Sequence, residues 1–160
     1  LQEYWDLFIL DALLGNFDRH ADNWGYFSIA GRTSLVSSPI YDCGSCLYPQ
    51  IADEAISGIL ADENEIIMRA DKFPTAALLL KNNQKANYKD YIQSLVNPDC
   101  TAALQRIYPR IDLTTINNVI DSEPLSDIRK DFYKVMLRAR FERILMSAYH
   151  SIYSQTSFFS

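Results

Sequence analysis

The chain has 160 residues, of which 48% are hydrophobic and 12% are aromatic, with only five glycines and six prolines. This length and composition are typical of a folded domain with its own core and exclude a disordered chain. The formal net charge of -5 at pH 7 argues against a general nucleic-acid-binding protein. Such a protein needs a basic surface to replace the counterions of the phosphates.

The sequence also predicts a cytoplasmic protein that does not enter a membrane. No apolar run approaches the roughly 20 residues needed to cross a bilayer, and no segment has the pattern of a signal peptide. The three cysteines, Cys43, Cys46 and Cys100, are too few for a disulfide framework, which suits a reducing compartment.

In chain order, the first predicted element is an apolar helix over residues 3–14, ended by a glycine. The sequence "GNFDRHADNW" follows at 15–24 and predicts a polar bend, because it gathers amide, carboxylate, guanidinium and imidazole groups directly after an apolar run. Two short strand-like runs over about 24–29 and 33–38 flank "AGR", so they predict a β-hairpin with Gly31 in its turn.

The rest of the chain has helical patterns. Asn97, Asp112 and Ser126 are predicted N-caps, and the helix after Ser126 is expected to run for about seven turns. The other predicted helices cover 53–60, 62–71, 74–82, 88–96, 98–107 and 112–121. The predicted fold is therefore predominantly α-helical (α+β), a single domain over residues 1–160 with one small β-hairpin near its N-terminal end and a long C-terminal helix.

Three oxygen-bearing side chains surround the predicted hairpin. Asp18 and Asn23 lie five residues apart in the polar bend, and Asp42 follows the hairpin that leads the chain back beside the bend. Carboxylate and amide oxygens are ligands that Mg²⁺ accepts together with phosphates and water. Each residue alone is typical of a capped turn, but their order around a hairpin favours a site for phosphoryl transfer.

The sequences of these motifs resemble those of a known family. Protein kinases carry a catalytic Asp, an Asn five residues later, a hairpin and then a metal-binding Asp. The sequences "LLGNFDRHADNWGYF" and "SPIYDCGSCL" resemble the C-terminal kinase lobe of the HipA-like family, in which G-N-x-D-x-H-x-x-N precedes P-x-Y-D. This motif resemblance covers residues 10–47. It implies a serine/threonine protein kinase that uses ATP and Mg²⁺, in some members as the toxin of a toxin–antitoxin pair.

The resemblance also implies a role for each matching residue. Asp18 would be the catalytic base or orient the attacking hydroxyl, and His20 would lie beside the phosphates. Asn23 and Asp42 would hold the metal, and Asn16, His20, Asn23 and Asp42 would together bind ATP. His20 would also belong to the catalytic pair with Asp18, and Asn16 would brace the loop by hydrogen bonds to backbone. A histidine in a polar loop is also typical of a simple hydrogen-bonding brace, and Arg19 is interpreted as structural.

A Gly-rich phosphate loop and a strand carrying an ATP-binding Lys do not occur in this sequence. They belong to the N-terminal lobe of such kinases, and the chain begins inside a predicted helix. We therefore expect the chain to be a fragment with little or no catalysis by itself, whose partners are ATP, its own N-lobe, a protein substrate and, by the resemblance, an antitoxin.

Two other functions stay open. A phosphoinositide-kinase-like enzyme shares D-R-H-x-x-N, although the acidic stretch after Asp42 offers no attraction for anionic lipid headgroups. A non-catalytic pseudokinase or binding module would keep the fold without the reaction.

The C-x-x-C spacing of Cys43 and Cys46 suits zinc or redox sites, but too few further ligands are available, and we interpret the spacing as coincidental.

Overall fold

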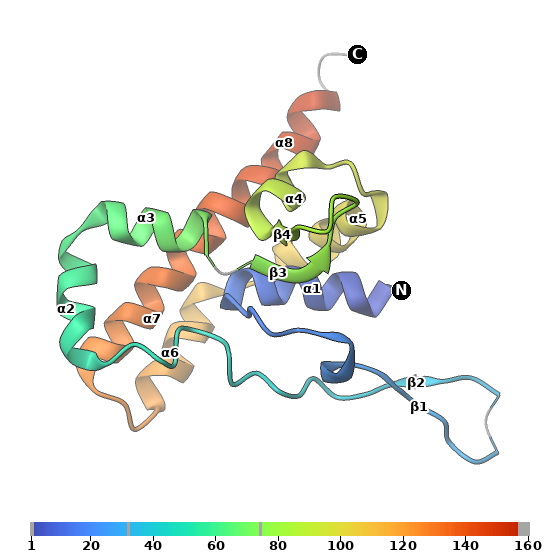
Figure 1. Cartoon of the computed structure of the whole chain (residues 1–160), viewed down its shortest axis with the longest axis horizontal. Coiled ribbons are helices and arrows are strands. Elements are labelled where there is room, and N and C mark those ends of the chain that lie inside the picture. The colour runs from blue at the N-terminus through green and yellow to red at the C-terminus, as the bar shows by residue number, and fades with distance from the viewer. Residues whose placement is uncertain (1, 32, 74, 157–160) are drawn as a thin grey trace.

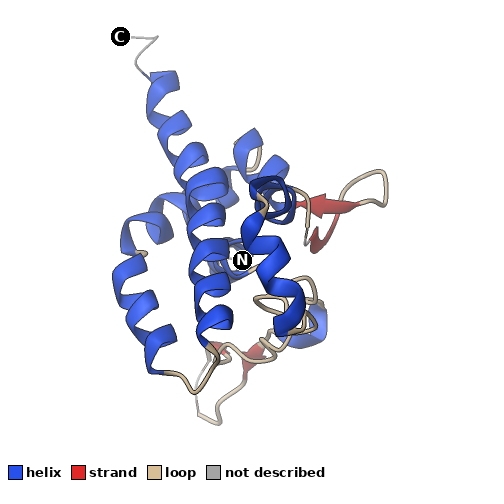
Figure 2. Ribbon diagram, turned by 90° about the vertical axis from the view of Figure 1, so that its left-hand side faces the viewer, coloured by secondary structure: helices blue, strands red, loops and turns tan. Residues whose placement is uncertain are grey.

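The computed structural model describes residues 2–31, 33–73 and 75–156. The chain forms a helical body with two small antiparallel hairpins (Figures 1 and 2). The elements in order are α1 (Gln2–Leu14), the short 3-10 helix η1 (Ala21–Asn23), β1 (Tyr26–Phe27), β2 (Val36–Ser37), α2 (Asp53–Ala61), α3 (Glu63–Asp71), β3 (Thr75–Leu79), β4 (Lys85–Asn87), α4 (Tyr88–Ser94), α5 (Pro98–Ile107), η2 (Tyr108–Arg110), α6 (Leu113–Ser122), α7 (Asp127–Arg140), the π-helical η3 (Phe141–Met146) and α8 (Ser147–Thr156).

The long C-terminal helix is confirmed and organises the body. α7, η3 and α8 follow one another without a break and form one rod, against which most other helices pack (Figure 1). The Ser126 hydroxyl accepts a hydrogen bond from the backbone N–H of Arg129, as predicted for an N-cap. The π-helical segment in the middle was not predicted, because the apolar pattern of a helix does not reveal a single wider turn.

Most of the other predicted helices are also confirmed. Asn97 and Asp112 cap α5 and α6, and Pro98 occupies the first turn of α5. α4 ends at Ser94, two residues before the predicted end at 96, because Leu95 adopts a left-handed backbone with φ of 52°.

The first hairpin is confirmed, but its strands are only two residues long. Tyr26 pairs with Ser37 and Phe27 with Val36, and Gly31 has the positive φ of 81° that a tight turn favours. Arg32, part of the predicted turn, lies outside the described residues. The hairpin projects away from the helices (Figure 1), so few of its side chains are buried and the ladder stays short.

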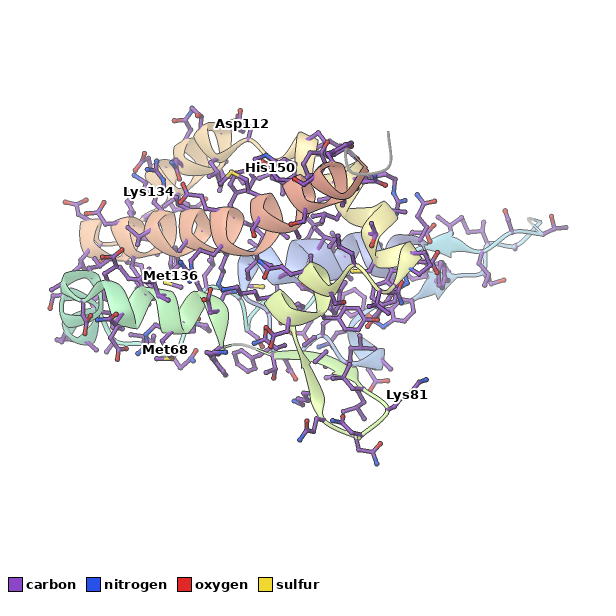
Figure 3. The ribbon with its side chains drawn as sticks, turned by 90° about the horizontal axis from the view of Figure 1, so that it is seen from above. Met68, Lys81, Asp112, Lys134, Met136 and His150 are labelled. Carbon is purple, nitrogen blue, oxygen red and sulfur yellow. The ribbon has the colours of Figure 1, made fainter. Side chains whose placement is uncertain are left out.

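The predicted helix at 74–82 is wrong. Residues 75–79 form β3, which pairs with β4 in a second antiparallel hairpin, and 80–82 belong to the connection between the two strands; the first residue of the predicted range, Pro74, lies outside the described residues. A short apolar run such as "TAALLL" fits either a buried strand or a helix by pattern alone. The turn after this run favours the strand over the helix, because Asn83 has a φ of 60° and leads the chain back. The tip, marked by Lys81, points away from the body (Figure 3).

Two groups of buried side chains make the core. The larger one joins α1, the second hairpin, α4, α5 and the C-terminal rod. The smaller one lies between α7 and the pair α2 and α3, and includes Met136 (Figure 3) together with Tyr48. Among the described residues, none of the helices has the length and apolar character required to traverse a bilayer.

Candidate functional site

The polar bend begins where α1 ends, at a sharp reversal of the chain. Gly15 has a φ of 70°, and its N–H donates to the carbonyl oxygen of Asp11 at 2.8 Å. Asn16 is fully buried; its Nδ2 donates to Asp11 Oδ1 and its Oδ1 accepts from the N–H of Asp18, both at 3.0 Å. The Tyr88 hydroxyl donates to the Asn16 carbonyl at 2.7 Å. The Asn16 side chain therefore joins the Asp11 carboxylate to the loop backbone at Asp18.

Arg19 is the buried centre of this loop. Its Nε and Nη2 donate to the two carboxylate oxygens of Asp11 at 3.0 and 3.2 Å. Its Nη1 donates to two carbonyl oxygens, that of Asn23 at 2.7 Å and that of Tyr41 at 2.6 Å. Nη2 also lies 3.6 Å from the Cys43 sulfur. One guanidinium thus joins α1, the polar loop and the segment that carries Asp42.

Burial and charge shift the pKa values of Asp11 and Arg19 in opposite directions. Burial raises the pKa of Asp11, and the hydrogen bonds from Arg19 and Asn16 oppose that rise. Burial by itself would lower the pKa of Arg19, but the hydrogen bonds and charge of Asp11 outweigh it, so the pKa of Arg19 is raised. Arg19 therefore stays protonated and keeps its full set of donors.

Two further bonds hold the Asp42 segment against the loop. The Tyr41 hydroxyl donates to the Asp22 carbonyl at 2.6 Å, and the N–H of Leu47 donates to the Leu14 carbonyl at 3.0 Å. The backbone on either side of Asp42 is therefore fixed to the end of α1 and to the polar loop. The structure brings the two motifs together, as the position of the hairpin between them predicted.

The three predicted oxygen ligands differ in their surroundings. Asn23 is buried and its Nδ2 donates to the Asp18 carbonyl at 2.7 Å. Among the described residues, no hydrogen bond engages the Asn23 Oδ1 or the carboxylates of Asp18 and Asp42, and both carboxylates lie on exposed residues. Asp42 has a φ of 53°, and such strained non-glycine positions cluster at functional sites.

The structure gives His20 the role of a brace. Its Nδ1 accepts a hydrogen bond from the N–H of Asp22 at 3.3 Å and caps η1. The side chain is half exposed, and Nδ1 lies 3.7 Å from a carboxylate oxygen of Asp22. Contact between His20 and phosphate stays a prediction.

The donor set suits Mg²⁺ better than a soft metal. In the described residues, no three His, Cys, Asp or Glu side chains gather closely enough to hold a metal by themselves. Mg²⁺ is commonly held by one or two carboxylates, with phosphates and water completing its shell. The unengaged oxygens of Asn23 and Asp42 fit that pattern, because nothing on the described part of the protein competes for them.

Cys43 and Cys46 are free thiols. Burial, and then the neighbouring Cys43, raise the pKa of Cys46 to about 12, so its thiolate is scarce at neutral pH. Cys43 lies beside Arg19 at the edge of the candidate site. The spacing therefore places one exposed thiol next to Asp42, and no disulfide joins Cys43 to Cys46.

Sequence reasoning missed Asp11 and the link through Tyr41. Asp11 was counted as part of an apolar helix, although a carboxylate within "FILDALL" is itself a signal, because buried acids are almost always paired. Arg19 was correctly interpreted as structural. Which carbonyls it would reach depends on the hairpin returning to the loop.

A pocket of about 240 Å³ lies beside Asn23, between α1 and the first hairpin. It is lined by Glu3, Asp6, Leu7, Leu10, Asn23, Trp24, Gly25, Tyr26, Ser37, Ser38, Pro39 and Ile40.

The polar loop, the first hairpin and the helical body together match the fold of a solved protein kinase. The chain is similar in sequence to the serine/threonine-protein kinase CtkA of Helicobacter pylori, with 43% identity over 143 residues, which cover 89% of this chain and 44% of that protein. The crystal structure described as a H. pylori proinflammatory kinase CtkA matches with a TM-score of 0.92 and 40% identity, over 97% of this chain and 57% of the other. No family model matches the sequence.

These matches confirm the family resemblance and the predicted fold class. The chain spans less than half the length of the curated relative.

Proposed function

We propose that this chain carries the C-terminal part of a kinase that transfers the γ-phosphoryl group of ATP to a Ser or Thr hydroxyl of a protein. The observation that carries the proposal is the pair of bonds from Arg19 Nη1. They hold the Asn23 and Tyr41 carbonyls on one nitrogen and so keep the loop and the Asp42 segment side by side. The similarity to a protein named as a serine/threonine kinase supports it.

In the proposed reaction each residue has one task. Asp18, which is exposed and whose carboxylate is hydrogen-bonded to none of the described residues, orients the acceptor hydroxyl and takes its proton as the oxygen attacks the γ-phosphorus. The bond from the γ-phosphorus to the bridging oxygen breaks, and ADP leaves. Asn23 and Asp42 would hold Mg²⁺, which neutralises charge on the phosphates when bound. Asn16, fully buried, supports the ATP site from beneath the loop, and His20 would lie beside the phosphates.

The proposed ATP site also needs residues beyond these 160. The sequence lacks a Gly-rich loop and an ATP-binding Lys strand. We propose that an N-lobe supplies them and that the 160 residues alone have little or no activity. A cytoplasmic location and an antitoxin partner stay predictions. Lipid as the acceptor is less favoured, because the segment at 42–65 has an acidic balance that repels anionic headgroups.

The test uses the full-length protein with radiolabelled ATP, Mg²⁺ and mixed protein acceptors. Asp18→Ala should lower transfer by about 100- to 10,000-fold and leave Mg²⁺-nucleotide binding within a few-fold. Asn23→Ala and Asp42→Ala should weaken Mn²⁺-nucleotide binding. Asp22→Ala is the matched control, because its carboxylate is exposed in the same loop.

Two outcomes contradict the proposal. If Asp18→Ala transfers phosphate as fast as Asp22→Ala, Asp18 has no part in the reaction. If the unaltered protein binds nucleotide and transfers phosphate neither to other proteins nor to itself, the binding-module interpretation is correct.

A further inference from the structure

Arg140, the last residue of α7, is buried where three segments meet, with 1% of its surface exposed. Its Nη2 donates to the Tyr48 hydroxyl at 2.8 Å and to the Phe73 carbonyl at 3.0 Å. Weaker contacts of 3.4 Å reach the carbonyl oxygens of Arg69 and Ala12. The side chain therefore touches the end of α1, the segment after Asp42 and the link from α3 to β3.

This arginine is unusual because no carboxylate in the described part of the chain balances its charge. Among the described residues, neither Asp nor Glu forms an ion pair with Arg140, and its Nε lacks a hydrogen-bond partner. Arg143, on the next turn of the same rod, pairs with both carboxylate oxygens of Asp71. A buried cation without a counterion is costly, and a leucine or methionine would fill the same space without that cost. The hydrogen bonds and close contacts of the guanidinium, and not its volume alone, therefore have to explain why an arginine occupies this position.

The first of these contacts is with Gly15, where the polar loop begins. The guanidinium lies so close to the glycine backbone that a Cβ added there would be 1.8 Å from Nη1. Arg140 thus covers the chain reversal that leads into Asn16 and Asp18.

The second contact is with Tyr48, in the segment after Asp42. Leu47 and Tyr48 are successive non-glycine residues with left-handed backbones, with φ of 59° and 55°. Such conformations persist only where the surroundings hold them. Arg140 donates to the Tyr48 hydroxyl, and its guanidinium carbon lies 5.3 Å from the centre of the Tyr48 ring. The adjacent Leu47 N–H is bound to the end of α1.

We propose that Arg140 is a positioning residue for the candidate site: it holds Gly15 and Tyr48 together and so sets the spacing between the polar loop and Asp42. This inference rests on the proposed function. The residue touches neither Asp18, Asn23 nor Asp42, and it acts through the backbone that carries them. A misplacement of about 1 Å by such a residue can lower a rate by about 100-fold.

The experiment compares Arg140→Lys and Tyr48→Phe in the full-length protein, with Arg143→Lys as control. The Arg140→Lys variant keeps the charge without the planar fork, and Tyr48→Phe keeps the ring without the hydroxyl. Three readouts are used: Mn²⁺ affinity with a non-hydrolysable ATP analogue, kcat and KM for ATP, and hydrogen exchange over residues 42–51. If Arg140 had a purely structural role, the substitutions would lower the free energy of unfolding but would change neither the Mn²⁺ affinity nor the kcat and KM for ATP of the folded protein.

We expect both variants to lower kcat by about 10- to 100-fold, to weaken Mn²⁺ binding, and to speed exchange over 42–51. Arg143→Lys should change none of these more than about two-fold. If Arg140→Lys does not fold, Tyr48→Phe decides. Wild-type kcat, metal affinity and exchange in Tyr48→Phe would overturn the inference.

Asn23→Ala, measured in parallel, separates the two proposals. If it abolishes metal binding while Arg140→Lys and Tyr48→Phe behave as wild type, only the positioning role is wrong. If Asn23→Ala leaves Mn²⁺ binding unchanged, the proposed function is wrong and this inference falls with it.

Discussion

Asp11 and Arg19 form a two-point ion pair beneath the polar loop, with separations of 3.0 and 3.2 Å. Both side chains are at least 95% shielded from solvent, with 2% and 5% exposed. The pair connects a helix to a loop that must otherwise order itself with few apolar side chains. It is therefore one of the contacts through which α1 positions the candidate site, together with the bonds from Asn16 to Asp11 and from Leu47 to Leu14.

Removal of the Arg19 side chain should destabilise the protein strongly. Arg19→Met leaves the Asp11 carboxylate buried without its cation, which we expect to cost about 3–5 kcal/mol in the free energy of unfolding. Arg106→Met is the control, because Arg106 and its partner Asp6 are partly exposed and such pairs contribute about 1 kcal/mol or less. Urea unfolding measures both; equal losses would mean that the buried pair is not special.

Gly15 should tolerate no side chain. Gly15→Ala imposes a left-handed backbone on alanine, at about 1–2 kcal/mol, and drives its Cβ into the Arg140 guanidinium. Gly31→Ala isolates the cost of the left-handed backbone, since Gly31 also has a positive φ and, apart from its chain neighbours, none of the described residues lies within 4 Å of an added Cβ. Gly15→Ala should therefore lower the melting temperature more than Gly31→Ala does. Similar shifts in the two variants would show that Arg140 moves aside freely.

Acid should weaken the link between α3 and the C-terminal rod. The hydrogen bond from Arg143 holds the pKa of Asp71 below its usual value of 3.8, with help from Lys89 and against the opposing effect of burial. A carboxyl whose pKa is lower in the folded state stabilises the fold above the unfolded pKa. That contribution is lost as the pH falls below 3.8 and through the lower pKa of the folded protein.

The measurement is urea unfolding from about pH 5 down to about pH 2. Asp71→Asn should lower the free energy of unfolding at neutral pH and reduce its decline over the acid range. Asp22→Asn, at an exposed carboxylate, is the matched control. An unchanged slope in Asp71→Asn would contradict the assignment.

Cys43 should report on the candidate site. It is exposed, whereas burial raises the pKa of both Cys46 and Cys100 to about 12. Because the thiolate is the reactive form, we expect iodoacetamide to alkylate Cys43 first. Mg²⁺ and ATP should slow this reaction in the full-length protein if the adjacent Asp42 holds the metal. Mass spectrometry follows each thiol, and equal rates with and without Mg²⁺-ATP would count against a metal at Asp42.

Much of the fold could be predicted because its signals are local. The caps Asn97, Asp112 and Ser126 bind backbone N–H groups two or three residues away, so a short stretch of sequence contains both partners. The Asn16 brace is of the same kind, since its Oδ1 accepts from the N–H of Asp18. The order of Asp18, Asn23, hairpin and Asp42 was sufficient to indicate a kinase-like site.

Other features depend on partners far along the chain. The run at 75–79 became a strand because 85–87 pairs with it, and no apolar pattern decides that pairing in advance. Arg19 meets Tyr41 across 22 residues, and Arg140 meets Ala12 across 128. The sequence by itself determined most of the helices and their caps, because local hydrogen bonds and periodicity encode them, and it set the order of the residues proposed for the site. Only the tertiary structure decided how the loop and the Asp42 segment are joined, because buried arginines are satisfied by whichever carbonyls the folded chain brings to them.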